Sequence, residues 1–91
     1  MKQPTKQPHL KKEDVRSQLR SLVNDIRVLS LKHPDEEVNE FKLGFINITL
    51  KKCNEILGDK RPYESFELFD TTKLPTNSDV LMILNTYLDV L

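Results

Sequence analysis

The 91-residue sequence predicts an all-α fold, a small antiparallel helical bundle with three main helices and one short helix. Apolar residues recur at intervals of three and four in three long segments, which is the period of an amphipathic helix. Pro34, Gly58, Pro62 and Pro75 fall between those segments, where the chain must turn. We expect residues 11–91 to form a single domain. We expect residues 1–10, with Pro4, Pro8 and almost no apolar side chains, to form a flexible basic arm.

The first helix is predicted over about 11–32. Its apolar residues follow a 4-3-4-3 spacing that places them along one side, and one further residue widens the stripe. They are Val15, Leu19, Leu22, Val23, Ile26 and Leu29. The helix should end near His33, because Pro34 disfavours a helical conformation in the residue before it.

The second helix is predicted over about 35–57. Pro34 suits a first helical turn, and the three acids that follow it would favour the positive end of the helix dipole. Gly58 supplies the stop. Gly44 costs helix stability, so we interpret it as a place where another helix approaches closely.

Apolar residues cover more than half of the circumference of this second helix, in two stripes. One consists of Val38, Phe41, Phe45 and Ile48, and the other of Leu43, Ile46, Leu50, Cys53 and Leu57. Together with Met82, which lies opposite the main face of the last helix, they exceed what so small a bundle covers. We therefore predict a homodimer that buries one stripe, through Leu43, Ile46, Leu50 and Leu57.

Aromatic residues at a spacing of three follow the second helix. Tyr63, Phe66 and Phe69 predict a short helix over about 62–69, with an extended segment as the alternative. In either form, the rings are expected to cover the core.

The last helix is predicted over about 77–91. Leu74 precedes Pro75 and is pushed towards an extended conformation. Thr76 followed by Asp79 matches a helix cap, in which the hydroxyl accepts a hydrogen bond from a first-turn amide, and Ser78 could serve instead. The polar run "PTNSD" is thus interpreted as a helix start and not as a catalytic or metal site.

The formal net charge is zero, but the charge is unevenly distributed. Residues 1–33 carry eight basic and three acidic side chains (+5), residues 34–62 carry five and six (−1), and residues 63–91 carry one and five (−4). The charges of the two ends partly compensate each other within the bundle, or both ends are simply solvated, or the basic end meets an anionic partner.

Basic residues cluster beside the apolar stripe of the first helix and form the candidate partner-binding surface. They are Lys11, Lys12, Arg16, Arg20 and Arg27. Such a cluster could bind an acidic protein or nucleic-acid phosphates. Alternatively, the arginines cover the core with their aliphatic stems.

Little in the sequence indicates chemistry. The single cysteine, Cys53, lies on an apolar stripe, where we expect it to be buried and unreactive. His9 and His33 have no second ligand at metal-binding spacing, so no metal and no cofactor is expected. The lone cysteine and the lack of a long apolar segment predict a cytoplasmic protein that does not enter membranes.

These observations favour a non-catalytic protein–protein interaction module, a small cytoplasmic adaptor or regulator. The alternative is a nucleic-acid-binding accessory protein that uses the N-terminal arm and the arginines of the first helix. An enzyme is not expected, because no nucleophile, base or cofactor-binding loop stands out.

Overall fold

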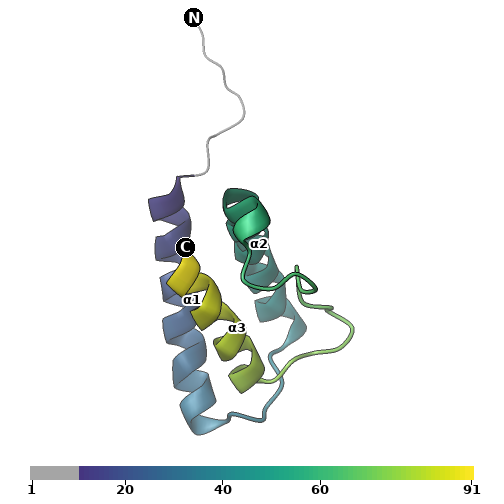
Figure 1. Cartoon of the computed structure of the whole chain (residues 1–91). Helices are drawn as coiled ribbons and strands as arrows, with labels where there is room; N and C mark the ends of the chain where they lie inside the picture. Colours follow the sequence, from purple (N-terminus) through teal and green to yellow (C-terminus); the bar gives the residue numbers. More distant parts are fainter. Residues whose placement is uncertain (1–10) are drawn as a thin grey trace, which may run out of the picture.

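A computed structural model describes residues 11–91, in which three α-helices pack against one another (Figure 1). They are α1 (Lys12–Lys32), α2 (Glu40–Leu57) and α3 (Asn77–Val90), with a short 3-10 helix, η1 (Gly58–Lys60), after α2. Helix α1 packs against both α2 and α3. The predicted all-α bundle is therefore confirmed. The predicted arm, residues 1–10, lies outside the described residues.

The direction of the helices follows from the long connection after α2. Helix α1 runs antiparallel to α2, and residues 61–76 then lead the chain back to the level at which α2 begins (Figure 1). Helix α3 therefore runs antiparallel to α1 and in the same general direction as α2.

The core lies where the three helices meet. Its buried side chains come from all three helices, among them Leu19 and Val23 of α1, Leu50 of α2, and Leu84 and Tyr87 of α3. The predicted stripe of α1 is only in part the buried one, because Leu22 and Leu29 lie at its edge and are half-buried.

The residues predicted for a dimer interface belong to this core. Leu43, Ile46 and Leu50 are at most 1% exposed within the single chain, and Leu57 is half-buried against the same cluster. A second copy could reach the first three only by unfolding the bundle. The other predicted stripe remains open at Phe41, Phe45 and Ile48, whereas its fourth member, Val38, is buried.

Helix α2 begins at Glu40, later than predicted. Residues 33–39 connect α1 to α2. Within this connection, Glu37 pairs with Thr76, the residue before α3, in an isolated antiparallel bridge. The Val38 amide donates to the Pro75 carbonyl at 2.8 Å, and Val38 itself is buried. Asn39 caps the helix by accepting from the Lys42 amide. Long-range backbone pairing has thus overridden the first-turn signals of Pro34 and the acids.

The short helix predicted over 62–69 is absent, and this segment has irregular backbone. Two asparagines of α2 hold it. The Asn47 side chain exchanges two hydrogen bonds of 2.9 Å with the backbone of Phe69, and Asn54 donates to the Glu67 carbonyl at 2.9 Å. Tyr63, Phe66 and Phe69 still pack against the core, as expected of either form.

Two glycines have different outcomes. Gly58 has a φ of 55° at the end of α2, as the predicted stop requires. Gly44 is not a site of close approach within residues 11–91, because a Cβ built there would meet none of their atoms within 4 Å. The predicted cap of α3 is confirmed, since the Thr76 hydroxyl accepts from the Asp79 amide at 3.2 Å.

Candidate functional site

The most unusual surface feature is a row of large apolar side chains on α2. Phe41, Phe45 and Ile48 are 76%, 54% and 55% exposed, and we call them the α2 apolar stripe. The rings of Phe41 and Phe45 meet edge to face with centroids 5.0 Å apart. Residues at this 4-3 spacing share one helix face, so the stripe is a continuous surface.

An open groove of about 500 Å³ lies beside the stripe, between α1 and α2. Phe45 and Ile46 form its α2 wall, Leu22 and Leu29 belong to its α1 wall, and Lys42 and Asp25 add one charge of each sign. A second hollow, of about 330 Å³, surrounds Gly44. It is lined by Glu40, Phe41, Gly44, Phe45 and Ile48.

The lining of both hollows suits the docking of an apolar surface. Apolar side chains dominate it, and its charged groups stand singly. Grooves that bind an amphipathic helix have such a lining. The bound helix fills the groove with apolar side chains at intervals of three and four residues. The described residues contain no group of three or more metal-ligating side chains that could hold an ion.

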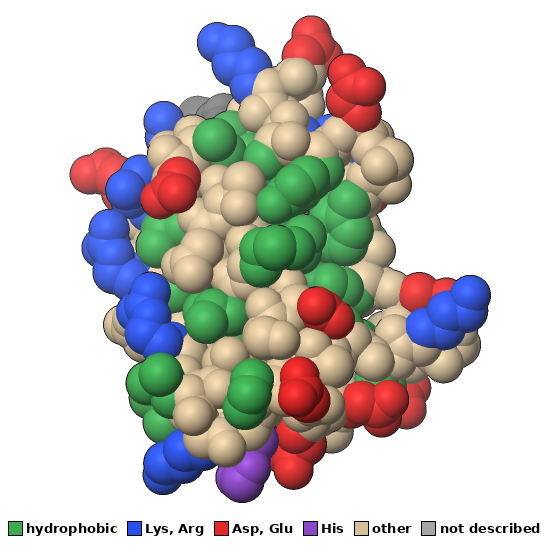
Figure 2. All heavy atoms as spheres, turned by 60° about the horizontal axis from the view of Figure 1, so that its bottom comes forward, with side chains coloured by type: hydrophobic (Ala, Val, Ile, Leu, Met, Phe, Trp, Pro, Cys, Tyr) green, Lys and Arg blue, Asp and Glu red, His purple; other side chains and the backbone are tan. Residues whose placement is uncertain are grey.

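Four residues of the predicted basic cluster share one side of α1, because Lys12, Arg16, Arg20 and Arg27 are spaced by four, four and seven residues. We call this side the basic edge; Lys11 is the residue that precedes the helix. Lys11, Lys12, Arg20 and Arg27 are exposed and Arg16 is half-exposed. Figure 2 shows basic side chains along the left edge of the molecule, where α1 lies, and apolar side chains in the middle of that face.

The arginines of the basic edge differ in their surroundings. Arg27 donates to Asn24 at 3.2 Å and to Asn85 of α3 at 3.5 Å. Within residues 11–91, Arg16 and Arg20 form no ion pair. These two guanidinium groups, one turn apart, therefore keep their charge available to a ligand.

The two surfaces flank α1 on different sides. The contact between Arg27 and Asn85 places the basic edge along α3. The groove faces α2, and on that side Lys52 donates to Gln18 at 3.4 Å. One partner could therefore occupy the α2 apolar stripe while another contacts the basic edge.

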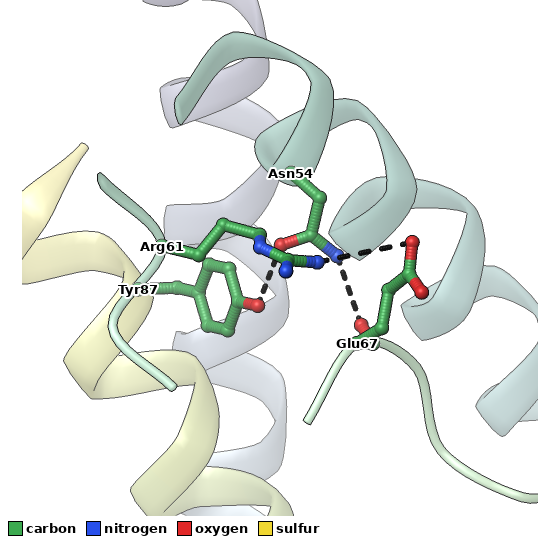
Figure 3. Close-up of polar contacts among 4 residues, drawn as sticks. All are labelled: Asn54, Arg61, Glu67 and Tyr87. Carbon is green, nitrogen blue, oxygen red and sulfur yellow. Dashed lines mark hydrogen bonds and ion pairs between the residues drawn. The ribbon is translucent and has the colours of Figure 1, made fainter. Parts of the chain in front are cut away.

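A buried polar cluster around Tyr87 has a structural role (Figure 3). The Tyr87 hydroxyl donates to the Asn54 side chain at 2.6 Å, and Asn54 donates to the backbone of Glu67. The Glu67 carboxylate pairs loosely with Arg61 at 3.9 Å. Burial raises the pKa of Tyr87, which keeps the hydroxyl protonated and able to donate. The cluster joins α2, α3 and the segment between them.

Cys53 lies in the core, as predicted. It is 0% exposed, and burial raises the pKa of its thiol to about 11. Such a thiol is not ionised at neutral pH, and the thiolate is the reactive form.

Comparisons with known proteins add no relative. No protein-family model matches the sequence, and comparisons with curated proteins and with solved structures give no match. Among the described helices, none combines the length and apolar character that crossing a membrane requires.

The sequence contains a signal that separates the two stripes of α2. Followed at helical spacing, the stripe of Phe41, Phe45 and Ile48 continues into Lys52 and Glu55, whereas the other stays apolar to Leu57. A stripe that becomes charged cannot be buried along its whole length. This observation favours the continuous stripe as the core and the interrupted one as surface.

Proposed function

We propose that this protein is a non-catalytic protein–protein interaction module, a small adaptor or regulator with two separate contact surfaces. The observation that carries the proposal is the exposure of Phe41, Phe45 and Ile48 on one face of α2. The bundle has a complete core without them, so their exposure has no role in folding.

Covering these side chains is favourable for any protein that fits them. Fully burying one Phe or Ile side chain contributes about 1.5–3 kcal/mol relative to leaving it exposed. Aromatic side chains are also enriched at the centres of protein interfaces. The stripe and the groove beside it therefore suit an amphipathic helix, whose apolar side would replace water over the two phenyl rings.

The basic edge supplies the second surface. Its cationic side chains favour an acidic protein and would raise the rate of encounter with one. Because this edge borders α3 and the groove borders α2, the two contacts do not compete.

Nucleic-acid binding through the basic edge is the second candidate. It is favoured by the unpaired charges of Arg16 and Arg20 within residues 11–91. Phosphate binding releases counterions, so the affinity would fall steeply and log-linearly with salt concentration. A protein partner held by the α2 apolar stripe would show a weaker dependence on salt.

Affinity co-purification from a lysate of the source organism, with and without nuclease, tests the proposal. The baits are the wild type, Phe45→Glu, Arg16→Glu/Arg20→Glu, and Met82→Glu as a matched control. Met82 is 59% exposed but lies on α3. We expect a nuclease-resistant protein partner that Met82→Glu retains and that Phe45→Glu or the arginine variant loses.

Two other results would contradict the proposal. Recovery of nucleic acid alone, abolished by Arg16→Glu/Arg20→Glu, would establish the second candidate. Turnover of a small molecule in an activity screen, without any recovered partner, would overturn both.

A further inference from the structure

We infer that the occupant of the α2 apolar stripe is a second copy of this chain, whose α2 lies antiparallel across the first. The inference rests on the proposed function, because it names the partner of one of the two proposed surfaces. Three features of α2 carry it: the spacing of the stripe, the hollow at Gly44 and the order of charges along the helix.

The spacing of the stripe suits helix-on-helix packing. Phe41, Phe45 and Ile48 are separated by four and then three residues, and Lys52 follows after four more. This alternation keeps one face towards a partner helix when two helices pack at a shallow angle. A second α2 presents the same alternation, so the two faces match without any change in the fold.

The hollow at Gly44 provides a place for a side chain of the second copy. A Cβ at Gly44 would meet nothing within 4 Å, and the hollow there is lined by Phe41, Phe45 and Ile48. A two-fold axis that crosses the pair level with Ile46 puts Ile48 of the second copy level with Gly44. Because the axis acts on both copies, each Ile48 enters the hollow of the other.

The charges along α2 are complementary when two copies of the helix lie antiparallel. Glu40 lies at the beginning of α2, and Lys51 lies about three turns later on the same flank of the stripe; both are exposed. The same axis brings Lys51 of the second copy level with Phe41 and within one residue of Glu40. In a parallel pair, the two-fold axis would run along the helices and put this flank of one copy on the opposite side of the seam from the same flank of the other. Glu40 and Lys51 would then not meet.

The size of the surface indicates the strength of the dimer. A standard stable interface covers about 800 Å² of each partner. Three side chains and the edge of the groove provide less than that, so we expect association at micromolar rather than nanomolar concentration.

Sedimentation velocity from micromolar to sub-millimolar concentration tests the surface. We expect the wild type and Met82→Glu to shift from monomer to dimer. Phe45→Glu and Gly44→Leu should weaken the dimer at least about tenfold. Gly44→Leu fills the hollow while giving α2 a better helix former, so loss of the dimer in this variant would not reflect unfolding. Circular dichroism confirms that each variant is folded.

A mixing experiment tests the antiparallel arrangement. Glu40→Lys and Lys51→Glu should each weaken self-association, because each brings like charges together across the axis. An equimolar mixture should recover much of the dimer, since both contacts between positions 40 and 51 then join opposite charges. No recovery would overturn the antiparallel arrangement.

The outcomes also separate this inference from the proposed function. A wild type that stays monomeric throughout, or a dimer that Phe45→Glu leaves intact, would overturn the inference. The proposed function fails instead when the co-purification recovers no protein that depends on either surface. A monomer whose protein partner is lost in Phe45→Glu would thus reject the second copy and retain the interaction module.

Discussion

At the scale of single residues, asparagines complete hydrogen bonds that the helices cannot. Asn39 caps α2, Asn47 and Asn54 hold the irregular segment after it, and Asn77 donates to the His33 carbonyl at 2.8 Å. A backbone group in irregular structure has no helical partner, and leaving it unpaired when buried is costly. The amide side chain both donates and accepts, so one residue can satisfy two groups.

Asn54 offers a direct test of this role. Replacing it with Ala leaves the Tyr87 hydroxyl, 0% exposed, without its acceptor at 2.6 Å. We expect Asn54→Ala to lower the free energy of unfolding by about 1–3 kcal/mol, measured by urea denaturation. Tyr87→Phe should cost less, about 1 kcal/mol, because it removes the hydroxyl itself. The double variant should cost less than the sum of the two, and strict additivity would show that the two side chains do not interact.

Cys53 links burial to pH dependence. Its pKa is raised from 9.0 to about 11 by burial. The protonated Cys53 thiol therefore contributes fully to the free energy of unfolding below the unfolded pKa of 9.0. This contribution is lost as the pH rises towards 11. We expect the difference in unfolding free energy between wild type and Cys53→Ala to shrink over this range. A difference in unfolding free energy that stays constant over this range would contradict the raised pKa of Cys53.

Residue patterns predicted some of these roles and not others. Thr76 and Asp79 are three apart, so the cap could be recognised locally. The partners of Asn47 and Asn54 lie 22 and 13 residues away, and no local pattern relates them. Burial of Cys53 followed from its apolar stripe.

At the scale of elements, local signals gave the right answer where tertiary pairing did not compete. Helices α1 and α3 lie within a residue of their predicted bounds. At α2, the predicted start failed because Glu36 and Val38 use their backbone groups to pair with residues 75–77. The aromatic segment over 62–69 failed for the same reason, since its backbone bonds to side chains of α2.

The cap of α3 is expected to be energetically important. Thr76→Ala removes the acceptor of the Asp79 amide, and we expect it to lower the unfolding free energy by about 0.5–2 kcal/mol. Thr76→Asp keeps an acceptor oxygen and should retain most of the stability. Thermal denaturation followed by circular dichroism measures both. Equal losses in the two variants would show that the hydroxyl does not act as a cap.

We expect the monomer to tolerate a side chain in place of Gly44. Because a Cβ there meets nothing, we expect Gly44→Ala to raise the unfolding free energy by about 0.5–1 kcal/mol. The measurement uses the Phe45→Glu background, so that self-association does not contribute. A decrease instead would mean that the backbone around Gly44 cannot tolerate a side chain.

At the scale of the whole molecule, one set of hydrogen bonds fixes how the helices are arranged. The connection between α1 and α2 is joined to the start of α3 by backbone bonds from Val38 to Pro75, Asn77 to Glu36, and Ser78 to Pro34. This pairing places the residues that lead into α2 beside those that lead into α3. It also orients α2, and so leaves Phe41 and Phe45 on the outside.

This arrangement explains why the sequence predicted two stripes on α2 but selected the wrong one as the free surface. Both stripes are apolar at helical spacing, and the choice depends on the angle at which α2 enters the bundle. That angle is set by pairing between segments almost forty residues apart, from Glu37 to Thr76. The charge gradient, in contrast, could be read directly from the sequence, and the basic side chains of α1 to which it points are exposed or half-exposed.

Asn77 contributes two hydrogen bonds to this junction. It is 2% exposed, its backbone amide donates to Glu36 at 2.9 Å, and its side chain donates to His33 at 2.8 Å. Asn77→Ala would leave the His33 carbonyl without this donor, and it would loosen the contact between the α1–α2 connection and α3. We expect it to lower the unfolding free energy by about 1–3 kcal/mol in urea denaturation.

Asn85→Ala is the control, because Asn85 lies on the same helix but makes only a 3.5 Å contact to exposed Arg27. This variant should lower the unfolding free energy by less than about 0.5 kcal/mol. Hydrogen exchange should show faster exchange of the Val38 and Ser78 amides in Asn77→Ala, since both donate across the same junction. Unchanged exchange at these two amides would mean that the backbone bridge holds the helices without the Asn77 side chain.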